Sequence, residues 1–150
     1  MGATYQFPFM PSPVDASTAF PNGRIAHRPF LPVTLRVVAT KQSVTTFALC
    51  DTGADHCTFP LSFTSNLGVD PATLAFELTS GFGGSQPTFF QDVEITVAWP
   101  GLQPFSFMAS AGFSAGMNAH GHGVLGQNGF FSQHRVTFDC AAKTFTVVIP

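Results

Sequence analysis

The sequence predicts an all-β fold built from many short strands. Two observations favour this class: short runs in which apolar and polar residues alternate, and turn residues that separate these runs at close intervals. A third is size and composition, because 150 residues with 45% hydrophobic and only 9% charged residues can bury the core of one folded domain. A net charge of -2 gives no electrostatic reason to bind nucleic acid or an anionic membrane.

The first 28 residues differ from the rest in composition. They contain Pro8, Pro11, Pro13 and Pro21, which prevent a regular helix and favour extended or irregular chain. We therefore predict an N-terminal arm over residues 1–28 and a domain over residues 29–150. Either the arm is loosely ordered, or it docks on the domain or on a second subunit through its aromatic residues Tyr5, Phe7, Phe9 and Phe20.

The first strands of the domain lead towards an acidic residue. Residues 33–37 alternate with a period of two, and residues 43–49 are rich in β-branched side chains. Both segments are therefore predicted strands, joined by a short polar turn, and the second leads into Asp51. Extended chain is expected again at residues 58–60. Residues 61–67 are compatible with a short helical turn before Gly68.

The second half of the chain reads as further strands and hairpins. Residues 76–79 and 88–90 are predicted strand arms on either side of a glycine-rich tip. Residues 91–99 are the clearest strand, because apolar side chains at every second position define one face. The other predicted strands are residues 105–111 and a C-terminal hairpin formed by residues 136–139 and 144–149.

The strand at residues 43–49 runs into the turn Asp51-Thr52-Gly53. A carboxylate placed where a strand becomes a loop is held by a rigid scaffold, which is a frequent position for chemistry. Gly53 allows another backbone to come close, and the Thr52 hydroxyl can both donate and accept a hydrogen bond. Alone, the tripeptide is equally compatible with an ordinary strand-to-turn junction, since Asp and Gly are favoured turn residues.

Two later segments change this interpretation. The glycine-rich tip at residues 81–84 follows Asp51-Thr52-Gly53, and Val124-Leu125-Gly126 comes after both. In this order the three elements resemble the catalytic loop, the flap and the hydrophobic-hydrophobic-Gly signature of the retropepsin-like aspartic proteases. The resemblance covers about residues 30–150.

The resemblance implies a fold and an activity. The fold would be a closed, mostly antiparallel β barrel with a glycine-rich flap hairpin, in which Val124-Leu125-Gly126 crosses beneath the catalytic loop and precedes the one short helix. The activity would be that of an aspartic-type endopeptidase acting on a polypeptide substrate without a cofactor or metal. One Asp per chain is half of such a site, so a homodimer would supply two Asp51 carboxylates that activate a water between them.

The resemblance also implies a role for each matched residue. Asp51 would be the catalytic carboxylate, Thr52 would brace the two loops across the dimer axis, and Gly53 would leave room for the substrate backbone. The other matched residues would line or cover the substrate cleft: Ala54, Asp55, Phe82, Gly83, Gly84, Ser85, Val124 and Leu125. Packing within the fold is the alternative role for Phe82.

One position departs from the family pattern. Many retroviral members carry an Arg after the hydrophobic-hydrophobic-Gly signature, and it pairs with the acid that corresponds to Asp55. Here that position holds Gln127. Because an unpaired buried carboxylate is costly, Asp55 is expected either to be exposed to water or to pair with another cation. The candidates are Arg24, Arg28, Arg36 and Arg135.

Two other functions fit parts of the sequence. A catalytically silent dimeric module of the same fold could bind peptides or scaffold an assembly, although such a module has no need of Asp51. A zinc-binding β domain could use His120 and His122 together with His56, Cys50 and Cys57. The spacing of these residues matches no common zinc pattern, and the glycines around His122 suggest a loop.

The cysteines and the N-terminal residues give an indication of the cellular compartment. Cys50, Cys57 and Cys140 form an odd set without a CxxC pair, so we expect them to be reduced and mostly packed rather than disulfide-bonded. No apolar run approaches membrane-spanning length, and the N-terminus lacks the basic start and apolar segment of a signal peptide. These features predict a cytoplasmic protein without a membrane or nucleic-acid partner.

Overall fold

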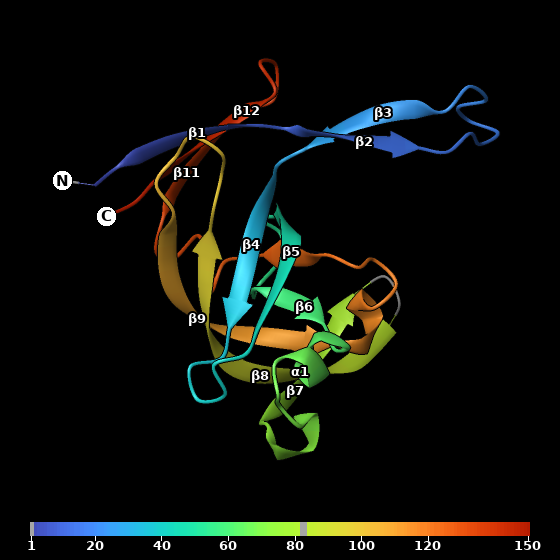
Figure 1. The fold of residues 1–150 in the computed structure, drawn as a ribbon. Coiled ribbons are helices and arrows are strands. Elements are labelled where there is room, and N and C mark those ends of the chain that lie inside the picture. The colour runs from blue at the N-terminus through green and yellow to red at the C-terminus, as the bar shows by residue number, and fades with distance from the viewer. Residues whose placement is uncertain (1, 82–83) are drawn as a thin grey trace. The chain divides into compact units, whose positions relative to one another are not determined.

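Strands dominate the chain, in agreement with the predicted all-β class (Figure 1). The computed structural model describes residues 2–81 and 84–150. They form two compact units, one of residues 31–133 and one of residues 1–30 with residues 134–150. No helix in the described parts of the chain is both long and apolar enough to cross a membrane.

A seven-stranded sheet makes up the unit of residues 31–133, in the order β4-β5-β10-β6-β9-β8-β7. Strand β4 pairs with β8 as well as with β5, so six of the strands form a ring and β7 lies at the end of the order. The strands are β4 (Phe30–Arg36), β5 (Ser43–Cys50), β6 (Thr58–Pro60), β7 (Phe76–Gly81), β8 (Gly84–Val97), β9 (Phe105–Ser114) and β10 (Gly123–Leu125).

The core of this unit follows the alternation seen in the sequence. In β8, Val93, Ile95 and Val97 are buried, which confirms the predicted apolar face of residues 91–99. Phe59 and Phe113 are fully buried and their ring centroids lie 6.2 Å apart. A Cβ atom on Gly123 would lie 2.2 Å from the Phe59 ring, so β10 can pass this aromatic pair only with a glycine at that position.

The helical segments are short. Helix α1 (Phe63–Asn66) lies within the predicted helical turn at residues 61–67, and the 3-10 turns are η1 (Pro71–Thr73) and η2 (Ala115–Met117). The expectation that a short helix follows Gly126 is wrong, because these residues form turns. Gly129 has a φ of 106°, which a right-handed helix does not allow.

The second unit contains two small sheets, and one of them joins the two ends of the chain. Strand β1 (Thr4–Pro8) pairs with β12 (Thr144–Val148), which also pairs with β11 (Arg135–Asp139), so the predicted C-terminal hairpin is confirmed. Strands β2 (Met10–Val14) and β3 (Arg24–Arg28) pair with each other. The first residues are therefore extended, as their prolines predict, and Phe7 of β1 is buried with its ring centroid 5.4 Å from that of Phe145 in β12.

Candidate active site

Asp51 lies at the point where β5 ends and a tight turn begins. Its backbone N–H donates to the carbonyl of Leu125 in β10 at 3.0 Å, which continues the parallel pairing of the two strands by one residue. The Gly53 N–H donates to Oδ1 of Asp51 at 2.8 Å, and the Ala54 N–H donates to the Asp51 carbonyl at 3.2 Å. The Gly53 N–H thus orients the carboxylate, while the Ala54 N–H closes the turn on the Asp51 backbone.

Strand β10 lies between the two strands that this turn connects. It is parallel to β5 and antiparallel to β6, so the chain after β10 runs directly against the loop of residues 51–57. The Gln127 N–H donates to the Ala54 carbonyl at 2.8 Å. A Cβ atom on Gly126 would lie 2.4 Å from the His56 carbonyl oxygen and 2.7 Å from that of Ala54. Glycine at position 126 is what permits this close backbone approach.

Asp51 lines a cleft of about 690 Å³. Six of the residues predicted for the site contribute to its lining: Asp51, Gly53, Ala54, Asp55, Gly84 and Val124. Residues of the β7–β8 hairpin also line the cleft, and the two strands of this hairpin pair as far as Gly81 and Gly84. The fold therefore brings the Asp51 turn, one arm of the predicted glycine-rich tip and β10 together at one cleft.

The other predicted site residues have different surroundings. Leu125 is fully buried, so its side chain belongs to the core beneath the cleft. Thr52 is exposed, and neither Thr52 nor Ser85 is among the described residues that line the cleft. Phe82 and Gly83 lie outside the described residues.

Gln127 and Asp55 are not linked as the Arg and acid of the family pattern would be. The Gln127 side chain donates from Nε2 to the Thr52 carbonyl at 2.6 Å, so it braces the turn through a neutral hydrogen bond. Asp55 is exposed and pairs with no cation within residues 2–81 and 84–150. Of the two expectations for Asp55, exposure to water is the one observed.

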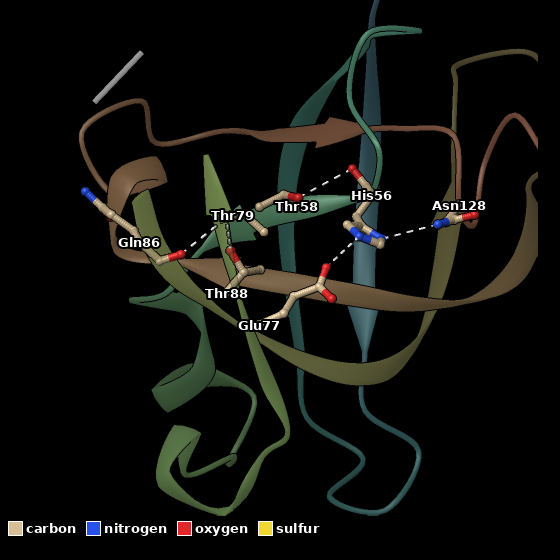
Figure 2. A network of polar contacts seen from close by, with 7 residues as sticks. All are labelled: His56, Thr58, Glu77, Thr79, Gln86, Thr88 and Asn128. Atoms are coloured by element: carbon tan, nitrogen blue, oxygen red, sulfur yellow. Dashed lines mark hydrogen bonds and ion pairs between the residues drawn. The ribbon is translucent and has the colours of Figure 1, made fainter. Parts of the chain in front are cut away.

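A polar network that the sequence did not predict borders the cleft (Figure 2). The His56 Nε2 atom lies 3.1 Å from Oε1 of Glu77 in β7, and its Nδ1 atom lies 3.5 Å from Nδ2 of Asn128. The sequence alone suggests a role for His56 only as a possible zinc ligand. Two features of the sequence could have indicated this network. His56 directly follows Asp55, and Glu77 lies on the predicted strand of residues 76–79.

Two threonines link the strands of the β7–β8 hairpin to each other (Figure 2). The hydroxyls of Thr79 in β7 and Thr88 in β8 lie 2.6 Å apart, and Thr88 is 1% exposed. A Cβ atom on Gly112 of β9 would lie 2.5 Å from the Thr88 methyl carbon. Close packing of Thr88 on Gly112 therefore joins the hairpin to β9.

Two buried thiols flank the Asp51 turn. Cys50 precedes it, Cys57 follows it, and both are free, as is the exposed Cys140. Burial raises the pKa of Cys57 to about 11, although a hydrogen bond with the Gly126 backbone opposes the rise. Burial also raises the pKa of Cys50, and the nearby Cys57 adds to this rise. Both thiols therefore stay protonated and unreactive at neutral pH.

Because of these thiols, the free energy of unfolding should depend on pH in the alkaline range. The folded chain keeps the Cys57 proton until the pH nears 11, whereas the unfolded chain releases it near pH 9.0, so the free energy of unfolding falls as the pH rises through this window. We expect a loss on the order of 2 kcal/mol from Cys57. Urea unfolding of the wild type and Cys57→Ala between these pH values measures it.

The matched control for this experiment is Cys140→Ala, which removes an exposed thiol. It should lose stability with pH as the wild type does, while Cys57→Ala should lose less because only Cys50 then contributes. Equal pH dependence in all three proteins would contradict the assignment.

The residues proposed for zinc are not grouped as a metal site. The ring centroids of His120 and His122 lie 5.6 Å apart, and Nδ1 of His122 lies 3.0 Å from the Gly123 carbonyl oxygen. Among the residues that the structure describes, no group of three or more His, Cys, Asp or Glu side chains is placed to hold a metal ion.

Comparison with protein-family models gives no match to the chain, and comparison with curated proteins gives none either.

Proposed function

We propose that the chain is an aspartic-type endopeptidase of the retropepsin-like kind, with Asp51 as its catalytic carboxylate. The observation that carries the proposal is the position of Asp51. It lines the cleft from a turn held by its own backbone bonds and by β10, which passes between the two strands that the turn connects. A carboxylate held this way is preorganised to exchange a proton with a bound water.

The remaining features of the proposal follow the same likeness. The ring of paired strands would be the closed β barrel of this family, and the β7–β8 hairpin would be the flap that covers an extended polypeptide. Side chains from both of its strands reach the cleft, among them Leu78, Thr79 and Gln86. A cleft of about 690 Å³ has room for several residues of such a substrate.

The proposed enzyme acts as a homodimer, since each chain supplies one Asp51. A two-fold interface brings the same residue from both chains together. Two carboxylates so close share one proton. The charged carboxylate takes a proton from a water whose oxygen attacks the peptide carbonyl carbon, while the protonated one donates to the carbonyl oxygen. The C–N bond of the resulting tetrahedral adduct then breaks as the amine nitrogen accepts a proton.

The proposal is tested by measuring peptide cleavage at several protein concentrations, from those that favour the monomer to those that favour the dimer. The protein is incubated with a mixture of unstructured peptides, the products are identified by mass spectrometry, and the molecular mass is followed by light scattering over the same concentrations. We expect cleavage, preferably between apolar residues, with a rate per chain that rises as dimer replaces monomer. Full activity from a monomer would refute the shared site, and absence of cleavage at concentrations where the dimer predominates would refute the proposal as a whole.

A further inference from the structure

A hydrogen bond between His56 and Glu77 joins two cleft segments that are distant in sequence. His56 belongs to the loop after Asp51, and Glu77 belongs to β7 of the hairpin. Both residues line the cleft, and both also line a second pocket of about 470 Å³ beside it. The pair therefore forms part of the wall between the two pockets.

Strand β7 has few other means of staying close to this loop. Among the described strands it pairs with β8 alone. Its apolar residues Phe76 and Leu78 are 61% and 69% exposed, so burial stabilises the strand little. Leu78 lies opposite Pro87, which has no N–H to donate to the ladder.

Within residues 2–81 and 84–150, the hydrogen bonds and ring contacts of the β7 side chains other than Glu77 stay within its own hairpin. Thr79 contacts Thr88, and the Phe76 ring centroid lies 5.8 Å from that of Phe89; both partners belong to β8. These contacts hold β7 to β8 but do not connect β7 to the loop after Asp51. The His56–Glu77 pair makes that connection at 3.1 Å.

The imidazole of His56 has three neighbours that orient it. Glu77 is at Nε2 and Asn128 is at Nδ1 (Figure 2). The Phe90 ring of β8 meets the imidazole edge-on, with the two ring centroids 5.0 Å apart. Asn128 and Phe90 carry no charge. In the two pockets that His56 borders, the titratable side chains besides His56 itself are Asp51, Asp55, Glu77 and His120.

We propose that His56 is a positioning residue whose protonation tightens the attachment of β7 to the loop that carries Asp51. Histidine ordinarily changes charge between about pH 5 and 8. An imidazolium bound to a carboxylate makes a stronger hydrogen bond than a neutral imidazole does. The attachment should therefore be firm in mildly acidic solution and loose above neutrality. Only the consequence for catalysis rests on the proposed protease activity.

Hydrogen exchange of the β7 amides measures the attachment without any assay of cleavage. We compare the wild type, His56→Asn, Glu77→Gln and the double variant at about pH 5.5 and about pH 8, always between proteins at the same pH. At the acidic pH, each single variant should exchange residues 76–80 about 2- to 5-fold faster, because the pair is partly exposed and screened by solvent. The double variant should match the single ones.

At the alkaline pH the differences should shrink, because histidine is ordinarily neutral there and a neutral imidazole makes a weaker hydrogen bond to a carboxylate. Matched controls are His27→Asn, an exposed histidine of β3, and Asp92→Asn, an exposed carboxylate of β8. Neither should change exchange in β7. Glu77 is 57% exposed and glutamine has the same shape, so Glu77→Gln tests the pair even if His56→Asn folds poorly.

Two results would overturn the inference: unchanged exchange of β7 in both single variants, or an equal effect at the two pH values. If the protein cleaves peptides, His56→Asn should also raise KM at acidic pH and leave it unchanged at alkaline pH. Cleavage without any exchange difference would refute this inference alone. An exchange difference without cleavage would support it and refute the protease proposal.

Discussion

Replacement of Asp51 by Asn should lower kcat/KM for peptide cleavage by about 10³-fold or more, because the amide can act neither as base nor as acid towards the bound water. The fold should survive. Asparagine has the same shape, and its side-chain oxygen can still accept the hydrogen bond that the Gly53 N–H makes with Oδ1. Peptide cleavage rates give the activity, and thermal unfolding reports the fold.

A matched control and a mixing experiment make this result specific. Asp92→Asn removes an exposed carboxylate of β8 and should cleave as the wild type does. Wild type mixed with an excess of Asp51→Asn should lose activity as subunits exchange, since a mixed dimer holds one carboxylate where two are required. Undiminished cleavage by Asp51→Asn alone would rule out Asp51 as the catalytic group.

Replacement of Gly126 by Ala should lower the free energy of unfolding by about 3 kcal/mol. The new Cβ atom would lie 2.4 Å from one backbone carbonyl oxygen and 2.7 Å from another, those of His56 and Ala54. Because both are backbone atoms, no side-chain rotation relieves the clash, and the loop after Asp51 must move. Urea unfolding measures the loss, and cleavage should fall with it.

Gly101→Ala is the matched control. Its φ is 82°, but a Cβ atom there has no neighbour within 4 Å, so only the backbone conformation is unfavourable. That should cost about 1 kcal/mol and leave cleavage unchanged. If Gly126→Ala were no less stable than Gly101→Ala, the close backbone approach at position 126 would not be rigid.

The strands could be predicted because alternation in sequence is alternation between the faces of a sheet. Val93, Ile95 and Val97 are buried as their spacing requires, and the C-terminal hairpin and helix α1 lie where turn residues and local pattern place them. The expectation that Val124-Leu125-Gly126 passes beneath the Asp51 turn came only from the family resemblance. No local signal shows that β10 pairs with β5 in parallel.

The features that could not be predicted depend on long-range contacts or on single backbone angles. The His56 contacts span 21 residues to Glu77 and 72 residues to Asn128, and they exist only in this strand register. The turns after Gly126 depend on the positive φ of Gly129, although the residues around it are compatible with a helix. Asp55 is exposed because of the path that the backbone takes between β5 and β6, and the amino-acid composition of the loop does not indicate that path.

The hydrogen bond from Gln127 to the Thr52 carbonyl has a consequence for the solvent conditions that the turn tolerates. An ion pair at this place would weaken as dissolved salt screens its charges and would break when its acid is protonated. An amide that donates to a backbone carbonyl has no charge to screen and no proton to gain in the working range of proteins. This one brace of the Asp51 turn therefore holds equally well in dilute buffer, concentrated salt and mild acid.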